Sequence, residues 1–318
     1  MAAARVLVLG ATGQLGADVV DAFGLAGWDV LGLGHSDVNV TDGPAVLSAV
    51  SAAHPSLVVN TAAFHHLDRC EEDQASAYAI NAIGARNVAA AAEDTGAALI
   101  HISTDYVFDG AKGSPYEERD LPGPLNVYGA SKLAGEHLVQ AICPRAFVVR
   151  TSGLYGPRPC RAKGGLNFPR LMLKLAAEQG QLTVVTDEVV GPTYTPDLAR
   201  QLVALAATDG YGIVHATGVG EVSWHAFAKE TLRLAGLFGV AVHEATTATM
   251  VRKVRRPAYS ILAHRRLQEL DIVVMRPWQE ALAEYVASLT EAERGEPTDP
   301  FQPTGLGRRS GMTAETVT

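Results

Sequence analysis

Cysteine is scarce in this sequence, and long hydrophobic runs are absent. The three cysteines, Cys70, Cys143 and Cys160, are too few and too scattered for a disulfide framework, and no Cys/His spacing suggests zinc or another metal. We therefore interpret them as small buried apolar side chains. No apolar stretch approaches the roughly 20 residues of a membrane span, and the first, residues 6–9, is too short for a signal peptide. The expected location is the cytoplasm.

An excess of positive charge is also missing, because the formal net charge is −8. This balance argues against binding of nucleic acid or of an anionic membrane through a general basic surface. It does not argue against a nucleotide ligand, since a few local N–H groups can hold a pyrophosphate. The 318 residues are enough to bury a large core and to form one big domain or two intimate ones.

The first half of the chain alternates short apolar runs with Ala-rich helical stretches. The runs read as continuous apolar segments, which is typical of parallel strands covered by helices on both faces. The expected strands are residues 5–9, 29–33, 57–60, 98–103 and 146–150. The expected helices are residues 16–26, 43–54, 75–95 and 128–142. Strand–helix alternation with right-handed crossovers predicts an α/β, doubly wound parallel-sheet Rossmann domain.

The pattern changes after Arg150, where residues 153–165 are rich in Gly, Pro and basic residues and are predicted to form a loop. Further helices are expected at 168–178, 195–207, 224–234 and 278–289, and further strands at 182–185 and 212–215. We predict that residues 1–152 and about 191–216 form the Rossmann domain. Residues 153–190 and 217–290 are predicted to form a smaller, discontinuous α/β substrate domain, and residues 291–318 a disordered tail.

Three glycines, Gly10, Gly13 and Gly16, follow the first expected strand and open the first helix. Such glycines allow a tight turn and the close approach of a pyrophosphate, and the helix N-terminus offers free N–H groups and a positive dipole. The alternative is a strand–helix turn that merely needs small residues. The position, the flanking segments and the alternation that follows favour dinucleotide binding.

The choice of cofactor depends on the end of the second strand. That strand ends in Gly32-Leu33-Gly34-His35-Ser36, with no acidic residue at its tip to bind a ribose 2′-hydroxyl. The absence favours NADPH, yet no Arg follows to hold a 2′-phosphate. Use of NADH as well as NADPH therefore stays open, and Asp37 is near enough in sequence to reverse the preference.

Two further motifs point to carbonyl chemistry. Ser103-Thr104-Asp105 leaves the carboxyl end of the fourth strand, where open α/β sheets bind ligands, and a hydroxyl there can hydrogen-bond a substrate carbonyl. Tyr128 and Lys132 lie one helical turn apart, so the ammonium would lower the pKa of the phenol and help it protonate a ketone oxygen. The alternatives are a strand-end turn and chance spacing, since the chain holds nine tyrosines.

Other candidates have ordinary alternatives. Asn60-Thr61-Ala62-Ala63 closes the third strand with small residues, either as a floor beneath the cofactor or for tight packing. His65 and His66 could form an acid–base pair, but lining of a pocket is favoured because the sequence shows no carboxylate partner. The basic cluster of residues 252–256 is more often solvated surface than a contact for a substrate diphosphate.

From about Arg5 to Leu289 the chain resembles the extended short-chain dehydrogenase/reductase superfamily and, within it, the dTDP-4-dehydrorhamnose reductase family. The matching segments are residues 10–16, 59–63, 103–110, 126–136, 150–152, 167–168, 192–194, 197–199 and 256–257. The resemblance implies transfer of a hydride from NAD(P)H to C4 of a nucleotide-linked 4-keto-6-deoxyhexose.

The resemblance also implies roles for individual residues. Thr104 would polarise the ketone, Tyr128 would protonate it, and Lys132 would orient the cofactor. Cofactor contacts are implied for Gly10, Thr12, Gly13, Gln14, Leu15, Gly16, Asn39, Val40, Ala62, Ala63, Phe64, His65, Tyr128 and Lys132. Among these, Gln14 and Leu15 would meet the pyrophosphate, and Asn39 and Val40 would flank the adenine. Substrate contacts are implied for Leu67, Thr104, Asp105, Tyr106, Tyr128 and Gly153.

The sequence departs from the family pattern at two places. The family's Trp after Arg-Thr-Ser, which lines the sugar site, is Gly153 here, so the pocket should be wider or filled from elsewhere. The family's Asp-Gln-x-Gly appears as Asp187-Glu188-Val189-Val190. Both changes leave the hydride chemistry intact and the identity of the sugar open.

Two other functions stay open at this level. An epimerase or dehydratase of the same superfamily would recycle its cofactor, but a dehydratase usually has Asp-Glu after the strand-end Thr, and Thr104 is followed by Asp105-Tyr106. The regulatory subunit of methionine adenosyltransferase resembles this family and binds cofactor for a partner enzyme. The presence of Thr104, Tyr128 and Lys132 favours catalysis. The oligomeric state is also open, with a homodimer among the alternatives.

Overall fold

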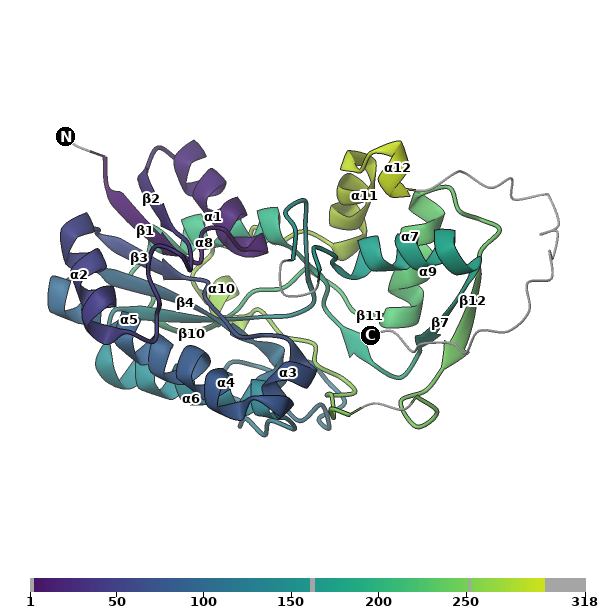
Figure 1. The fold of residues 1–318 in the computed structure, drawn as a ribbon, viewed down its shortest axis with the longest axis horizontal. Coiled ribbons are helices and arrows are strands. Elements are labelled where there is room, and N and C mark those ends of the chain that lie inside the picture. Colours follow the sequence, from purple (N-terminus) through teal and green to yellow (C-terminus); the bar gives the residue numbers. More distant parts are fainter. Residues whose placement is uncertain (1–2, 161–163, 251–252, 295–318) are drawn as a thin grey trace.

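The computed structural model describes residues 3–160, 164–250 and 253–294, which form two lobes (Figure 1). Within these residues, a sheet of six parallel strands has the order β10-β5-β4-β3-β1-β2. The strands are β1 (Arg5–Leu9), β2 (Asp29–Leu33), β3 (Leu57–Asn60), β4 (Ala98–Thr104), β5 (Ala146–Thr151) and β10 (Gly212–His215). The predicted α/β class with a doubly wound parallel sheet is therefore confirmed.

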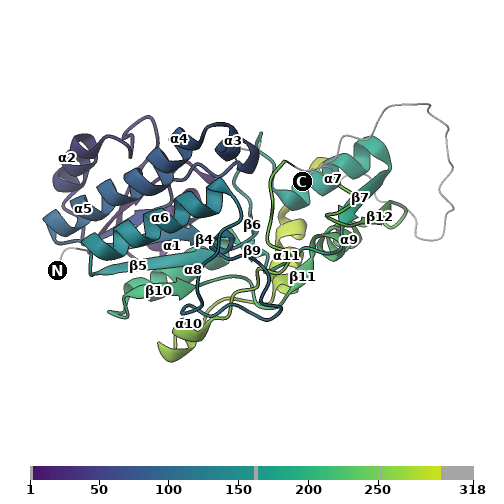
Figure 2. The same ribbon diagram turned by 90° about the horizontal axis from the view of Figure 1, so that it is seen from below.

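Helices cover both faces of this sheet (Figure 2). One hydrophobic cluster joins the sheet to α2 (Gly43–Ala53), α5 (Ala85–Thr95) and α6 (Val127–Ile142). A second joins the other face to α1 (Gln14–Leu25) and α8 (Thr195–Ala206). All residues of β3 and β5 are buried, whereas the edge strand β2 is largely exposed. The continuous apolar runs thus mark strands whose two faces are both covered.

The carboxyl ends of β1 and β3 define where a ligand can bind at the edge of the sheet. The chain leaves β1 for β2 on one side and then crosses back to β3 on the other, so the strand order reverses between β1 and β3. Open α/β sheets bind ligands in the crevice at such a reversal, outside the carboxyl ends of the strands. The glycine turn after Leu9 and the segment after Asn60 both lie at this point.

The prediction of a single helix at residues 75–95 is wrong. The chain instead forms α4 (Gln74–Tyr78), a π-helical segment η1 (Ala79–Gly84) and α5, preceded by an unpredicted helix α3 (Leu67–Glu72). The π segment coincides with Asn81, whose backbone closely approaches Gly135 of α6. Tertiary contacts of this kind leave no mark on a 3.6-residue period, and π segments are frequent at functional sites.

The second lobe contains several small paired strands. These are β6 (Leu154–Tyr155) with β9 (Thr193–Tyr194), β7 (Gln181–Val185) with β12 (Ala241–Ala245), and β8 (Val189–Val190) with β11 (Val222–Ser223). Its helices are α7 (Phe168–Gln179), α9 (Trp224–Leu234) and α11 (Trp278–Ser288), and α10 (Arg265–Glu269) lies beside β10. A separate hydrophobic cluster, which includes Tyr155, Phe227 and Tyr285, holds this lobe together. The domain boundaries given above stay a prediction.

Two further expectations need correction. Residues 153–165 are not loop throughout, because Leu154 and Tyr155 pair with Thr193 and Tyr194. The tail does not begin at residue 291, because Glu291–Arg294 form helix α12, where Glu293 pairs with Arg170 at 2.7 Å. The rest of the predicted tail, residues 295–318, lies outside the described residues. None of the helices in the described part of the chain has the length and apolar character to cross a membrane.

Candidate active site

The glycine turn after β1 is shaped by two close approaches. Gly10 has a φ of +80°, and a Cβ there would lie 2.6 Å from Thr61 Oγ1. A Cβ on Gly16 would collide with the carbonyl oxygen of Gly10. Gly13 is less crowded, since its Cβ would meet only Gly10 O at 3.2 Å among the described residues. The need for small residues in a strand–helix turn therefore explains Gly10 and Gly16. It does not explain Gly13, where a side chain would meet less crowding.

The N-terminus of α1 is suited to an anion. Its N-cap is Gly13, no side chain of the described residues caps it, and its first turn contains no acidic residue. In contrast, α2 and α6 are capped by Asp42 and Asn126. The side-chain amide nitrogen of Gln14, Nε2, is buried without a hydrogen-bond partner in the described part of the chain. Free N–H groups, a positive dipole and an unpartnered buried amide together fit a dinucleotide pyrophosphate.

Replacing Gly16 by Ala should destabilise the protein, because the new methyl group would force the first turn of α1 away from Gly10. The expected loss is about 1–3 kcal/mol in the free energy of unfolding. Gly24, on the exposed end of the same helix, is the matched control, because its Cβ would meet nothing within 4 Å among the described residues. Gly24→Ala should gain about 0.5–1 kcal/mol. Urea denaturation of both variants measures the difference, and equal stabilities would contradict this account.

The segment after β2 forms hydrogen bonds within itself and packs against the glycine turn. The Asp37 carboxylate accepts a hydrogen bond from Gly34 N at 2.7 Å, so it closes its own turn. A Cβ on Gly34 would lie 2.9 Å from Thr12 Cγ2, which places Thr12 against this turn. Asn39 Oδ1 accepts from Thr41 N at 3.1 Å. Val40 is buried in the hydrophobic core, and its backbone carbonyl accepts a hydrogen bond from Asn87 Nδ2 at 2.9 Å.

A polar chain runs from β3 to α6 beneath the candidate site. Asn60 Oδ1 accepts from Ala62 N at 3.1 Å, and Asn60 Nδ2 lies 3.2 Å from His101 Nδ1. The other ring nitrogen of His101 lies 3.3 Å from Lys132 Nζ, and Lys132 donates to Ile102 O at 2.6 Å. Burial, with a contribution from Lys132, holds the pKa of His101 well below its ordinary value. The segment after β3 and the Lys132 side chain are therefore positioned together.

Thr104 and Tyr128, from β4 and α6, lie near enough for the Thr104 hydroxyl to act on the phenol of Tyr128, where it counters the rise in pKa that burial causes. Thr104 Oγ1 also donates to Asp105 Oδ1 at 3.1 Å and accepts from Tyr106 N at 3.2 Å, so the strand-end turn proposed as an alternative is present as well. The Tyr106 ring packs edge-on against Tyr128, with centroids 5.7 Å apart. Ser152 donates to the buried Asp105 carboxylate at 2.8 Å. Thr104, Asp105, Tyr106 and Tyr128 thus form one cluster.

The expectation that Lys132 lowers the pKa of Tyr128 is wrong. Burial raises the pKa of Tyr128, and only the neighbouring Thr104 hydroxyl acts to lower it. Lys132 is 1% exposed, and burial lowers its pKa to about 8. Its ammonium points to Ile102 O, because the interior of the sheet provides the acceptor that the buried group needs. The one-turn spacing predicted proximity correctly but could not predict burial.

The pKa of Lys132 predicts a pH dependence of stability. Below pH 8 Lys132 is protonated in both states, but between about 8 and its ordinary 10.5 the unfolded chain binds more protons than the folded one. The contribution of Lys132 to the free energy of unfolding should therefore rise with pH across this window. Lys132→Met should remove this rise. Urea denaturation of both proteins at several pH values measures it, and parallel pH profiles would contradict the assignment.

Asn81 and Ser131 were missed by the sequence analysis. Asn81 Oδ1 accepts from Phe64 N at 2.8 Å, and its Nδ2 donates to Phe64 O at 2.9 Å and to Ser131 Oγ at 3.0 Å. Ser131 donates to Tyr128 O at 2.9 Å. These bonds fix the segment around Ala63 and Phe64 against α6. A sequence signal for Asn81 is missing, because its partners are 17 and 50 residues away.

The two histidines have separate partners. His66 Nδ1 accepts from Arg69 N at 3.5 Å and so caps α3, which begins at Leu67. His65 Nε2 lies 3.6 Å from Cys160 Sγ. Each imidazole thus has its own structural partner, and the lining of a pocket by these histidines stays a prediction. All three cysteines are free thiols and buried, as expected.

Gly153 lies where a ring from the second lobe approaches. It has a φ of +55°, and a Cβ there would lie 3.2 Å from Pro192 Cα and 3.6 Å from Trp224 Cη2. The space beside Gly153 is thus filled from elsewhere, by an aromatic ring of α9. In the basic cluster, Lys253 Nζ pairs with Glu72 at 3.4 Å, and Arg252 lies outside the described residues.

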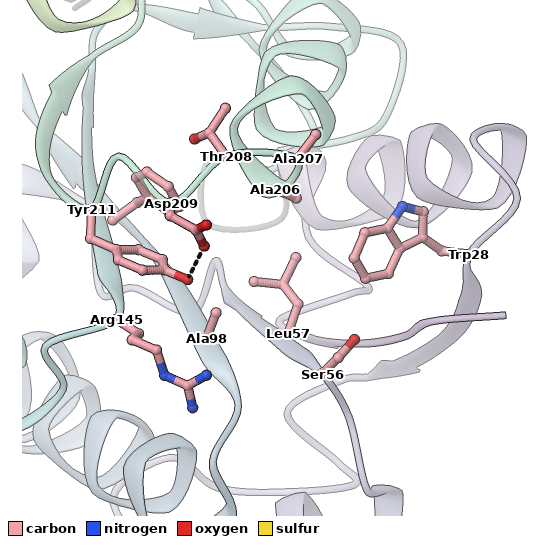
Figure 3. Close-up of a pocket in the computed structure, with 11 residues that line it drawn as sticks. Trp28, Ser56, Leu57, Ala98, Arg145, Ala206, Ala207, Thr208, Asp209 and Tyr211 are labelled. Carbon is pink, nitrogen blue, oxygen red and sulfur yellow. Dashed lines mark hydrogen bonds between the residues drawn. The ribbon is translucent and has the colours of Figure 1, made fainter. Parts of the chain in front are cut away.

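A cavity of about 250 Å³ lies away from these motifs (Figure 3). Leu57 and Ala98 line it, and they begin β3 and β4, whereas Asn60 and Thr104 end these strands. The Tyr211 hydroxyl donates to Asp209 at 3.1 Å across its wall. The cavity therefore belongs to the amino edge of the sheet, opposite the edge where α/β sheets bind ligands.

Comparison with known proteins agrees with this geometry. A protein from Bacillus subtilis named spore coat polysaccharide biosynthesis protein SpsK is 40% identical over 91% of this chain and 99% of its own length. A Streptomyces griseus dTDP-4-dehydrorhamnose reductase is 40% identical over 90% of this chain and 94% of its own length. The solved dTDP-4-dehydrorhamnose reductase of Bacillus anthracis in complex with NADP has a TM-score of 0.86 and 36% identity, covering 91% of this chain and all of that one.

The match to a family extends over both lobes. The profile of the RmlD substrate binding domain family matches residues 4–291, which include the glycine turn, the Thr104–Tyr128 pair and the second lobe. The relatives cover nearly the same span at 36–40% identity. This chain therefore belongs to the RmlD substrate binding domain family.

Proposed function

We propose that this protein is an NADPH-dependent reductase that acts on the C4 ketone of a nucleotide-linked 4-keto-6-deoxyhexose. The observation that carries the proposal is the placement of Thr104, at the carboxyl end of β4, beside Tyr128, which lies one helical turn from the buried Lys132 on α6. Relatives at 36–40% identity are named as dTDP-4-keto-sugar reductases, and the Bacillus anthracis relative was solved with NADP. NADH remains a second cofactor to test.

The residues of the cluster divide the chemistry between them. NADPH, when bound, supplies a hydride to the ketone carbon. With substrate bound, the Thr104 hydroxyl turns from Asp105 Oδ1 to donate its hydrogen bond to the ketone oxygen, and Tyr128 gives that oxygen a proton, so that the C=O bond becomes a CH–OH group. Lys132 binds the nicotinamide ribose, and the uncapped turn at Gly13 and Gln14 holds the pyrophosphate. Asp105, Tyr106, Leu67 and Gly153 border the sugar in this proposal.

The partner of this enzyme is then a small nucleotide sugar, and nucleic acid and membranes have no part in the reaction. We place the reaction in the cytoplasm, because relatives such as SpsK are named for polysaccharide biosynthesis. A homodimer stays a prediction, which light scattering of the purified chain would test.

The test is oxidation of NADPH by the purified chain in the presence of dTDP-linked 4-keto-6-deoxyhexoses. A panel that varies the carrier nucleotide and the sugar stereochemistry would identify the substrate. Steady oxidation with at least one dTDP-4-keto sugar is the expected result. Tight NADPH binding without turnover on the whole panel would instead favour the regulatory-subunit alternative, and conversion without net oxidation would favour an epimerase or dehydratase.

The reaction should not require a divalent metal ion. In the proposed step the hydroxyl groups of Thr104 and Tyr128 stabilise the charge that develops on the ketone oxygen, so a metal ion has no role in it. Treatment with EDTA should leave the rate of NADPH oxidation unchanged. Loss of activity in EDTA that is restored by Mg²⁺ would count against this prediction.

A further inference from the structure

The segment of residues 253–264, here called the crossing segment, connects the two lobes. On the second lobe, Val189 N donates to Ala258 O at 2.8 Å, and Ser260 N donates to Val189 O at 3.1 Å. On the sheet lobe, Tyr116 N donates to Ile261 O, and Ala263 N to Tyr116 O, both at 2.8 Å. The crossing segment is therefore hydrogen-bonded to both lobes and fixes the second lobe relative to the sheet.

Asn126 joins the crossing segment to the catalytic helix α6. Its Oδ1 accepts a hydrogen bond from Gly129 N at 2.8 Å and caps the helix. Its Nδ2 donates to Arg255 O at 2.9 Å, across 129 residues of sequence. Asn126 is 9% exposed, so water competes little for either bond. One side chain thus holds the first turn of α6 and the crossing segment at the same time.

The first turn of α6 contains the proposed proton donor. Tyr128 lies between Asn126 and Gly129, the two ends of the capping bond. The crossing segment has little freedom to move away, because a Cβ on Gly110 would lie 2.6 Å from Ala258 N and Val254 is buried. A change in the bond from Asn126 to Arg255 would therefore be taken up by the turn that carries Tyr128.

We propose that Asn126 is a positioning residue that sets the Tyr128 phenol against the sugar held by the second lobe. This inference rests on the proposed reductase function. A helix cap alone needs only an acceptor, which Asp and Ser supply as well as Asn. The amide donor of Asn126 is needed only for the bond to Arg255 O. The two roles can therefore be separated by substitution.

The experiment compares Asn126→Ser and Asn126→Asp with the wild type. Both variants keep a capping oxygen and lose the amide donor, and only Asp adds a charge. We expect melting temperatures close to that of the wild type, an unchanged dissociation constant for NADPH, and a fall in kcat of about ten- to a hundredfold from misplacement of Tyr128. Asp42→Ser, which exchanges the cap of α2 outside the cluster around Thr104 and Tyr128, is the control and should keep the wild-type kcat.

The outcomes separate the inference from the proposed function. A wild type that oxidises NADPH with a dTDP-4-keto sugar, with both Asn126 variants reduced in kcat, supports the inference. An active wild type with either variant near full kcat overturns it, because the lost donor would then not be the cause. A wild type without turnover on the sugar panel removes the proposed function, and the inference with it.

Discussion

Tyr128→Phe should lower kcat by about 10²–10⁴-fold, while the dissociation constant for NADPH stays close to that of the wild type. The substitution removes the phenolic proton and keeps the ring that packs against Tyr106. Thr104 would remain hydrogen-bonded to Asp105, so the rest of the cluster should keep its place. Steady-state kinetics with NADPH and a dTDP-4-keto sugar measure kcat, and quenching of protein fluorescence measures cofactor binding.

Tyr211→Phe is the matched control for this prediction. Tyr211 also uses its hydroxyl in a hydrogen bond, to Asp209, but at the opposite edge of the sheet. It should lose no activity. If Tyr128→Phe turned over at nearly the wild-type rate, Tyr128 would have no role in proton transfer, and another acid would have to be sought.

Arg150→Met should cost about 3–5 kcal/mol in the free energy of unfolding, because it leaves a buried carboxylate without its partner. Arg150 Nη2 lies 2.7 Å from Glu136 Oε2, and the two side chains are 2% and 1% exposed. Glu136 also accepts from Ser103, directly before Thr104, so the loss should reach the active site. Urea denaturation measures the change.

Two comparisons define the cause of that loss. The double variant Arg150→Met, Glu136→Leu should recover most of the stability, since both charges are then removed. Arg233→Met, which breaks an exposed pair with Glu230 on α9, should cost less than about 1 kcal/mol. A small loss for Arg150→Met, similar to that for the exposed pair, would show that the buried pair contributes no more to stability than an exposed one.

The strands of the sheet were predictable because their burial leaves a direct mark on the sequence. The expected β1, β2, β3 and β10 have the observed bounds, and β4 and β5 extend one residue further. The short paired strands of the second lobe, such as β8 with β11, were missed. Two residues are too few to show a period, and their pairing joins positions 30 residues or more apart.

The active site shows a similar limit. The proximity of Thr104 and Tyr128 was predictable because each belongs to a recognisable local motif, while their catalytic roles stay a proposal. Asn81 and the bond from Asn126 to Arg255 were not, because their partners lie far away in sequence. The pKa of Tyr128 was predicted in the wrong direction, because helical spacing shows which groups are near but not how much water they lose.

The departure at Gly153 shows what local reading can and cannot provide. The sequence indicated that an aromatic wall is lost there, and left open whether the space is empty or refilled. The structure places Trp224, from 71 positions further along the chain, against the backbone of Gly153. The space beside Gly153 is therefore decided by packing between α9 and the segment after β5.

Isotope transfer tests the central claim most directly. NADPH that carries deuterium at both C4 positions of its dihydronicotinamide ring is mixed with the enzyme and a dTDP-linked 4-keto-6-deoxyhexose. Nuclear magnetic resonance and mass spectrometry of the product then locate the label. The proposed mechanism predicts one deuterium on C4 of the new alcohol for each NADPH oxidised. A product without deuterium at C4 would contradict it.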